Sequence, residues 1–98
     1  MFARVTTLQT SPDRIEESVQ FVREQALPAM QKRPGFQTMY YLIDRQAGRA
    51  MAIALWDTEE DVLATEEQAR QLRATAVEGV SAPPTAQIYE VSFQAGEA

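Results

Sequence analysis

The chain has 98 residues, a net charge of −5 at pH 7 and no cysteine. Its length predicts a single domain, and its acidic balance argues against nucleic acid and anionic membranes as partners. No apolar run approaches the roughly 20 residues of a membrane span, and the first residues lack the pattern of a signal peptide, so we expect a cytoplasmic protein. The sequence also lacks histidine and asparagine, and it shows no set of metal ligands, so we expect neither a metal nor a cofactor.

Strand and helix patterns alternate in the first third of the chain. Residues 2–9 are rich in β-branched side chains and predict a half-buried strand. Ser11 can cap a helix and Pro12 suits its first turn, and apolar residues then recur at helical spacing from Ile15 to Ala26. Pro28 lacks a backbone donor, so we expect it to kink or end this amphipathic helix.

A β-hairpin is predicted next. Residues 36–43 form its first strand, residues 44–48 its turn and Arg49–Trp56 its second strand. A five-residue turn would place on the face of Trp56 the side chains of Phe36, Thr38 and Tyr40. A four-residue turn would instead place there Gln37, Met39 and Tyr41. The sequence leaves this register open.

The second hairpin strand carries a row of small side chains on one face. Side chains alternate along a strand, so the row consists of Ala50, Ala52 and Ala54 and ends at Trp56. A face that only packs tightly would more often carry valine, isoleucine or leucine. The row therefore predicts either a close approach of helices to the sheet or the floor of a pocket.

A second helix is predicted over residues 59–78, with a variant capping box that begins at Thr58. Its apolar stripe is interrupted by Glu66 and Arg73, which lie two turns apart. We expect Glu66 to pair on the surface with Arg70, four residues further on. If it were buried without a partner, its pKa would rise and it could act as a base.

The end of the chain completes the pattern of elements. Gly79 would stop the second helix, residues 81–84 would link it to a last strand over residues 85–93, and residues 94–98 would form a disordered tail. The order of elements predicts an α+β domain over residues 1–93, with a ferredoxin-like split βαβ arrangement, a four-stranded antiparallel sheet and two main helices.

Five segments stand in an order that is typical of one family. They are Leu27–Met30, Pro34–Phe36, the turn at Asp44, Leu55–Glu60 and Ile88–Val91. Together they resemble the antibiotic biosynthesis monooxygenase family of the dimeric α/β-barrel superfamily. The resemblance implies a homodimer whose two sheets pack face to face as a barrel, with a pocket in each subunit between helices and sheet. We assign Met39 and Met51 to the dimer core.

The resemblance also bears on the chemistry. Family members that oxidise aromatic polyketide intermediates without a cofactor look to rely on Asn and Trp, and relatives that degrade heme on Asn, Trp and His. Trp56 matches the Trp, whereas Thr6 and Thr7 stand where the Asn is expected, and Thr65 and Glu66 near the position of the His. Heme degradation is disfavoured because the chain has no imidazole ligand.

Five residues are candidates for substrate binding. Trp56 would stack on a flat aromatic substrate, or would instead fill the core. Arg73 would hold an anionic quinol or carboxylate, or its stem would pack while its head reaches water. Tyr40 and Tyr41 would donate a phenol hydrogen bond or fill the core, and Thr6 is the remaining candidate.

Two functions stay open at this point. The first is a cofactor-independent monooxygenase that acts on a small aromatic, quinol-like substrate, whose own electron-rich anion would react with oxygen. The second is a non-catalytic small-molecule-binding or accessory protein that keeps the fold and the pocket.

Overall fold

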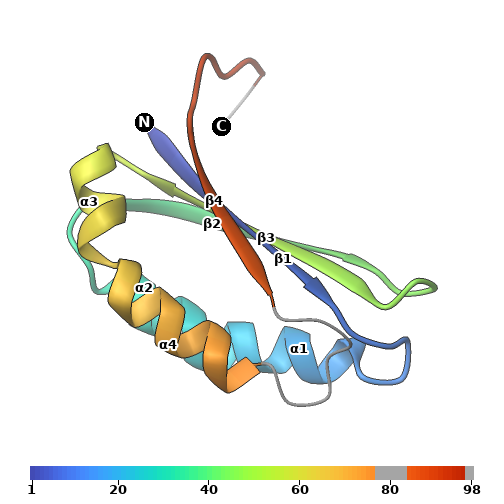
Figure 1. Ribbon diagram of the computed structural model, residues 1–98. Helices are drawn as coiled ribbons and strands as arrows, with labels where there is room; N and C mark the ends of the chain where they lie inside the picture. The colour runs from blue at the N-terminus through green and yellow to red at the C-terminus, as the bar shows by residue number, and fades with distance from the viewer. Residues whose placement is uncertain (77–83, 97–98) are drawn as a thin grey trace.

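The computed structural model describes residues 1–76 and 84–96. Its elements, in chain order, are β1 (Phe2–Gln9), α1 (Ile15–Phe21), the π-helical segment η1 (Val22–Ala26), α2 (Leu27–Gln31), β2 (Phe36–Asp44), β3 (Arg49–Trp56), α3 (Glu59–Ala64), α4 (Glu66–Ala76) and β4 (Thr85–Glu90). The strands form an antiparallel sheet in the order β2-β3-β1-β4. The predicted α+β, ferredoxin-like fold is confirmed. Figure 1 shows the helices gathered on one face of this sheet.

The first helix begins at Ile15, three residues later than the cap at Ser11 predicts. The Ser11 hydroxyl bonds to the Asp13 carboxylate and lowers its pKa, so it does not cap the helix. The backbone N–H of Arg14 donates to the Ser11 carbonyl at 3.0 Å, which closes a turn before the helix starts. A local side-chain hydrogen bond has therefore displaced the helix start.

Pro28 does not end the first helix. The segment Val22–Ala26 forms a π-turn, and the Leu27 N–H that follows it donates to the carbonyl of Val22, five residues earlier. Pro28 then falls in the first turn of α2, where a missing N–H costs no helical hydrogen bond. The wider π-turn thus lets the helical path continue to Gln31.

The hairpin contains features of both predicted registers. Residues 45–48 form a four-residue turn, which pairs Tyr41 with Ala52 and Met39 with Ala54. A β-bulge between Phe36 and Thr38 then shifts the register, so that Phe36 pairs with Trp56. Because one residue is extra on β2, odd-numbered and even-numbered side chains of that strand share the face of Trp56.

Gly48 closes the hairpin turn with a φ of +69°. A Cβ atom there would lie 2.5 Å from the backbone carbonyl carbon of Ser11, too close for any side chain. The Thr10 N–H donates to the Gly48 carbonyl at 2.8 Å. A glycine is therefore required where the chain leaving β1 crosses the hairpin.

The second helix is divided at Thr65, which corrects the prediction of one continuous helix. The Thr58 hydroxyl accepts from the Asp61 N–H at 3.1 Å, so the predicted start is confirmed. The Thr65 hydroxyl donates to the carbonyl of Val62 at 2.8 Å, and its backbone leaves the helical region before α4 begins. The predicted stop at Gly79 and most of the predicted linker lie outside the described residues.

The last strand, Thr85–Glu90, is three residues shorter than predicted. β4 pairs with β1 as far as the partners Glu90 and Phe2. Beyond it, the Val91 N–H still donates to the Met1 carbonyl at 2.9 Å. Among the described residues, no helix has both the length and the apolar character needed to cross a membrane.

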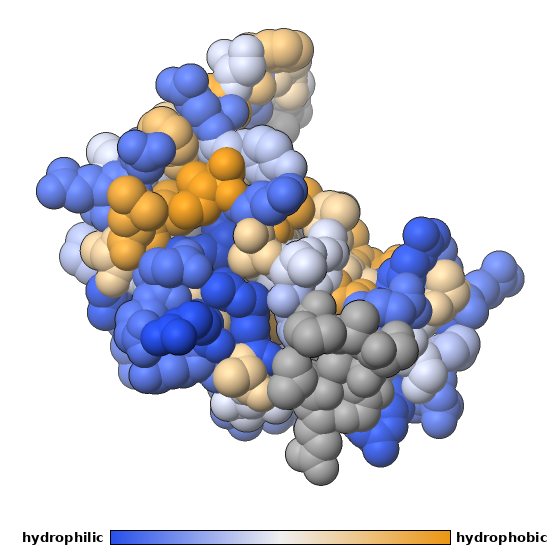
Figure 2. Space-filling view, viewed as in Figure 1, coloured by the Kyte–Doolittle hydropathy of each residue, from blue (hydrophilic) through white to orange (hydrophobic). Residues whose placement is uncertain are grey.

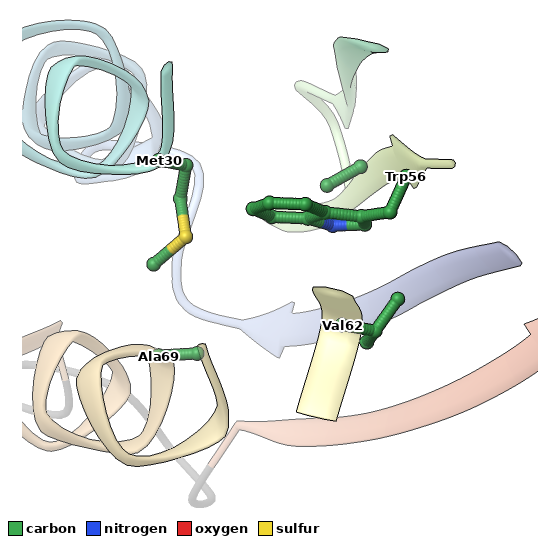
Figure 3. Close-up of a cluster of buried hydrophobic side chains, with 5 residues drawn as sticks. Met30, Trp56, Val62 and Ala69 are labelled. Carbon is green, nitrogen blue, oxygen red and sulfur yellow. The ribbon is translucent and has the colours of Figure 1, made fainter. Parts of the chain in front are cut away.

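The core lies between the sheet and the helices. Its buried cluster joins β3 to α2, α3 and α4 and consists of Met30, Ala54, Trp56, Val62 and Ala69. Figure 3 shows the indole of Trp56 extending towards Met30, with Val62 beside it. Phe36 packs edge-on against Trp56, with ring centroids 5.4 Å apart and planes at 84°. Aromatic pairs favour this geometry.

The opposite face of the sheet carries no helix among the described elements (Figure 1). The side chains on it include Val5, Tyr40, Leu42, Met51, Ile53, Leu55 and Tyr89. Tyr40, Leu42 and Tyr89 are each about half exposed. By contrast with this apolar face, the surface in the region of α4 is mainly hydrophilic, as Figure 2 shows from the same side as Figure 1. We call this apolar side of the sheet the open face.

Met39 lies on the helix side of β2, opposite Ala54. It contacts the core cluster and does not belong to the open face, because the four-residue turn sets its direction. Its assignment to a dimer core between two sheets is therefore wrong. Met51 does point to the open face, as the alternation along β3 requires.

Candidate functional site

A cavity of about 470 Å³ lies between the helices and the sheet. Ala52 and Ala54 of β3 lie on its sheet side, and Phe21, Val22 and Leu72 line its helix side. This volume falls within the range of small-molecule sites. Both expectations for the alanine row are met, because Ala54 also packs in the core against the helices. Small side chains on the central strand thus leave the space that the cavity occupies.

Three of the five candidate residues line this cavity. They are Thr6 on β1, Tyr41 on β2 and Arg73 on α4. Tyr40 points to the open face and is 54% exposed, because it alternates with Tyr41 along β2. Trp56 is fully buried in the core cluster and is not among the lining residues. In this conformation its indole therefore has no direct contact with the cavity.

A charged cluster forms one wall of the cavity. Arg4 of β1 is 4% exposed and lies within 3.0 Å of Glu66, which also binds Arg73 at 2.9 Å. The same Arg4 nitrogen, Nη2, donates to the Val62 carbonyl at 2.9 Å and to the Thr65 hydroxyl at 3.0 Å. One carboxylate thus joins two guanidinium groups at the point where α3 ends and α4 begins.

The predicted surface pair of Glu66 and Arg70 is wrong. Arg70 instead pairs with Glu67, and both of these side chains are about two thirds exposed. Glu66 turns inward because the break at Thr65 changes the direction of the chain and brings it over Arg4. The sequence pattern of α4 alone favours a surface pair, since spacings of three and four are equally close on a helix.

Arg4 was not among the predicted site residues. A signal was present, because Arg4 is the one charged side chain in the strand over residues 2–9 and shares a strand face with Phe2 and Leu8. A charge on a half-buried strand needs a partner, and Glu66 interrupts the apolar stripe of the second helix in the same way. Two interruptions of opposite charge on facing elements indicate an ion pair between them.

Burial and charge set the protonation states of the cluster. Desolvation raises the pKa of Glu66, but the hydrogen bond from Arg73 and the charges of Arg4 and Arg73 outweigh it and hold the pKa below its usual range. Desolvation lowers the pKa of Arg4, and Glu66 opposes that effect. Glu66 is therefore ionised at neutral pH, and the idea that it serves as an unpaired buried base is excluded.

Tyr41 is one of the polar residues on the sheet side of the cavity. Burial raises the pKa of its hydroxyl, and the nearby Ser18 hydroxyl opposes part of this effect without reaching hydrogen-bond geometry. Ser18 donates instead to the Ile15 carbonyl at 2.6 Å. Tyr41 is therefore a neutral phenol at pH 7, able to donate a hydrogen bond to a bound molecule.

The depressed pKa of Glu66 gives the first testable prediction. Ionised Glu66 stabilises the folded state above the unfolded pKa of about 4.5, and this contribution is lost as the pH falls through the lower folded pKa. Replacing Glu66 with glutamine should lower the free energy of unfolding by roughly 1 kcal/mol at pH 7, the upper end for partly exposed ion pairs.

Urea unfolding of both proteins at several pH values would check this. The difference in stability between wild type and Glu66→Gln should shrink below about pH 4.5, where the Glu66 carboxylate of the unfolded chain begins to bind a proton. Glu60→Gln, on the exposed first turn of α3, serves as the control. A difference that stays constant from pH 7 to pH 3 would contradict the ionised cluster.

Comparisons with known proteins support the fold of this chain but do not establish its activity. No protein-family model matches the chain. An uncharacterised protein of Mycobacterium tuberculosis is 32% identical over 92 residues, which are 94% of this chain and 41% of that protein. A second uncharacterised protein of the same organism is 33% identical over 76 residues, or 78% of this chain and 32% of that protein. The chain thus spans less than half the length of these relatives.

Solved structures share the whole architecture. A monooxygenase of Streptomyces coelicolor, in complex with nanaomycin D, superposes with a TM-score of 0.80, 17% identity and coverage of 99% of this chain and 92% of that one. A heme-degrading protein of Mycobacterium tuberculosis, with two hemes bound, gives a TM-score of 0.75, 17% identity and coverage of 98% and 100%. The chain therefore has the fold of the antibiotic biosynthesis monooxygenases, and the resemblance seen in the sequence is confirmed at that level.

Proposed function

We propose that the protein binds a small, flat aromatic molecule of the quinol class in the cavity and promotes its oxygenation without a cofactor. The observation that carries this proposal is the cavity of about 470 Å³ between helices and sheet, with an apolar lining, one neutral phenol and a cationic wall. The related fold of a monooxygenase that holds nanaomycin D supports the class of ligand.

The chain's own residues would act by binding and desolvation. The alanine row and the apolar side chains of α1, η1 and α4 exclude water from the ring system. Tyr41 would donate to one ring oxygen, and Arg73 would stabilise negative charge on the other. A quinol takes up O₂ with one oxygen atom entering the ring and the other leaving as water, so that 1,4-dihydroxynaphthalene would yield 2-hydroxy-1,4-naphthoquinone.

Labelled oxygen tests this proposal. We expect 1,4-dihydroxynaphthalene and ¹⁸O₂ to give hydroxynaphthoquinone with one labelled atom, faster with protein than without. Ala52→Phe should abolish the protein-dependent rate, because the larger side chain fills the cavity, whereas Ala52→Ser should retain it. Product without label, or equal rates for the two variants, would contradict oxygenation in the cavity.

One observation favours a second candidate, a binding protein without catalysis. The sequence has no histidine or asparagine, and Glu66 is held ionised by two arginines, so among the described residues the cavity has no poised general base. Saturable binding of hydroxynaphthoquinone together with unaccelerated oxygen uptake would establish this function instead.

The open face supports a homodimer. Side chains of β1, β2 and β3 present a continuous apolar surface there, with Leu42 at 49% and Tyr40 at 54% exposure. Uncovered apolar faces of this kind mark association surfaces. We infer that two copies pack these faces together, and we place the dimer in the cytoplasm on the basis of its acidic, cysteine-free sequence.

A further inference from the structure

We propose that the cavity selects ligands that carry a single negative charge, and that Arg4 and Arg73 together recognise that charge. This inference rests on the proposed function and names the substrate class of the same site, a quinol or quinone with one ionised oxygen. It depends on three features of the cavity wall, namely its residual charge, its unused donors and its burial.

The residual charge of the wall is positive, although the chain as a whole is acidic. Among the described residues, the charged side chains that line the cavity are Arg4, Arg14, Arg73 and Glu17. Glu17 pairs with Arg14 at 3.6 Å, and Glu66 is shared by the other two arginines. Three positive charges against two negative ones leave one charge uncompensated, on the Arg4–Arg73 pair.

The wall also holds unused hydrogen-bond donors. The Nε of Arg4 and the Nη1 of Arg73 are buried and have no hydrogen-bond partner among the described residues. Buried donors are nearly always satisfied in folded proteins, and hydrogen bonds to ionised groups are the stronger ones. In this conformation both atoms are buried against the protein, so an anion in the cavity would neutralise the guanidinium charge directly and would accept from these donors only after a side-chain rotation. A neutral ligand of the same shape would leave the positive charge uncompensated.

The carboxylate of Glu66 does not bond to either of these donors. Its two oxygens already accept from Nη2 of Arg4 and Nη2 of Arg73, at 3.0 and 2.9 Å. Its role in recognition is to cancel one of the two guanidinium charges. The site is thereby matched to a monoanion, and removal of the Glu66 charge should strengthen anion binding further.

Two naphthoquinones of nearly equal shape test this selectivity. 2-Hydroxy-1,4-naphthoquinone is ionised at neutral pH, whereas 2-methoxy-1,4-naphthoquinone is neutral. Calorimetric titration of the wild-type protein at pH 7 should show about tenfold or greater preference for the hydroxy compound. Neither compound requires oxygen to bind, so a failure of oxygenation would leave this result intact.

Substitutions in the protein then distinguish recognition of the negative charge from a general effect on the fold. Arg73→Gln should reduce the preference to about one while leaving the affinity for the methoxy compound within about twofold, and Glu66→Gln should increase the preference. Arg70→Gln, an exposed substitution on the same helix, should leave it unchanged. Equal affinity of the wild type for both compounds would overturn the proposal. So would a loss in Arg73→Gln that is equal for both.

Discussion

Replacing Trp56 with alanine is expected to lower the free energy of unfolding by about 3–5 kcal/mol. The indole is fully buried, packs edge-on against Phe36 and lies in a cluster with Met30 and Val62 (Figure 3). Its removal would leave a cavity where β3 meets α2, α3 and α4. The backbone cannot move in to fill this cavity without disturbing the pairing of β2 with β3.

Urea unfolding at pH 7, followed by circular dichroism, measures this loss. Phe93→Ala provides the control, because Phe93 is 81% exposed and its truncation should change stability by less than about 0.5 kcal/mol. A loss below 1 kcal/mol in Trp56→Ala would contradict its place in the core. Trp56→Phe keeps a ring and removes a buried N–H that has no partner among the described residues. It should cost less stability and change ligand affinity by less than about twofold.

Replacing Ile53 with glutamate is expected to convert the proposed homodimer into a monomer. Ile53 lies at the centre of the open face, between Val5 of β1 and Tyr40 of β2. In a face-to-face dimer, the Ile53 side chain of each copy would be buried in the interface. The substitution would therefore bury two unpaired carboxylates, each of which costs several kcal/mol. We therefore expect dimerisation to weaken by about a thousandfold or more.

Sedimentation equilibrium at micromolar concentration measures this effect. The wild type should sediment at about twice 11.0 kDa and Ile53→Glu at the mass of one chain. Gln46→Glu, in the hairpin turn, adds the same charge away from the open face and should remain dimeric. A folded Ile53→Glu protein with the wild-type mass, or a monomeric wild type, would show that this face is not the interface.

Local signals were sufficient to predict most of the fold. The strand over residues 49–56 and the cap at Thr58 each depend on neighbouring residues, and the structure reproduces them. The hairpin turn was predicted over residues 44–48, but Asp44 still belongs to β2, so the turn is one residue shorter. The π-turn before Pro28 and the break at Thr65 were not predicted. Both are irregularities within helices. At Thr65 the break is held by hydrogen bonds from Arg4 on a distant strand, which no local pattern contains.

Part of the candidate site was predictable because one of its residues interrupts an apolar pattern. Arg73 stood out because it breaks an apolar stripe, and it does line the cavity. Tyr40 and Tyr41 could not be separated, because which of them faces the helices depends on the length of the hairpin turn, which the sequence leaves open. Arg4 was missed because its partner Glu66 lies 62 residues away in the sequence.

The proposed function requires that a small aromatic molecule binds between the helices and the sheet. Methyl-resolved NMR during titration with 2-hydroxy-1,4-naphthoquinone tests it most directly, because β3 presents methyl groups to both sides. We expect the methyl signals of Ala52 and Ala54 to shift with saturation, while those of Ile53 and Leu42 on the open face do not. Saturable shifts confined to Ile53 and Leu42, or no saturable shift at all, would contradict it.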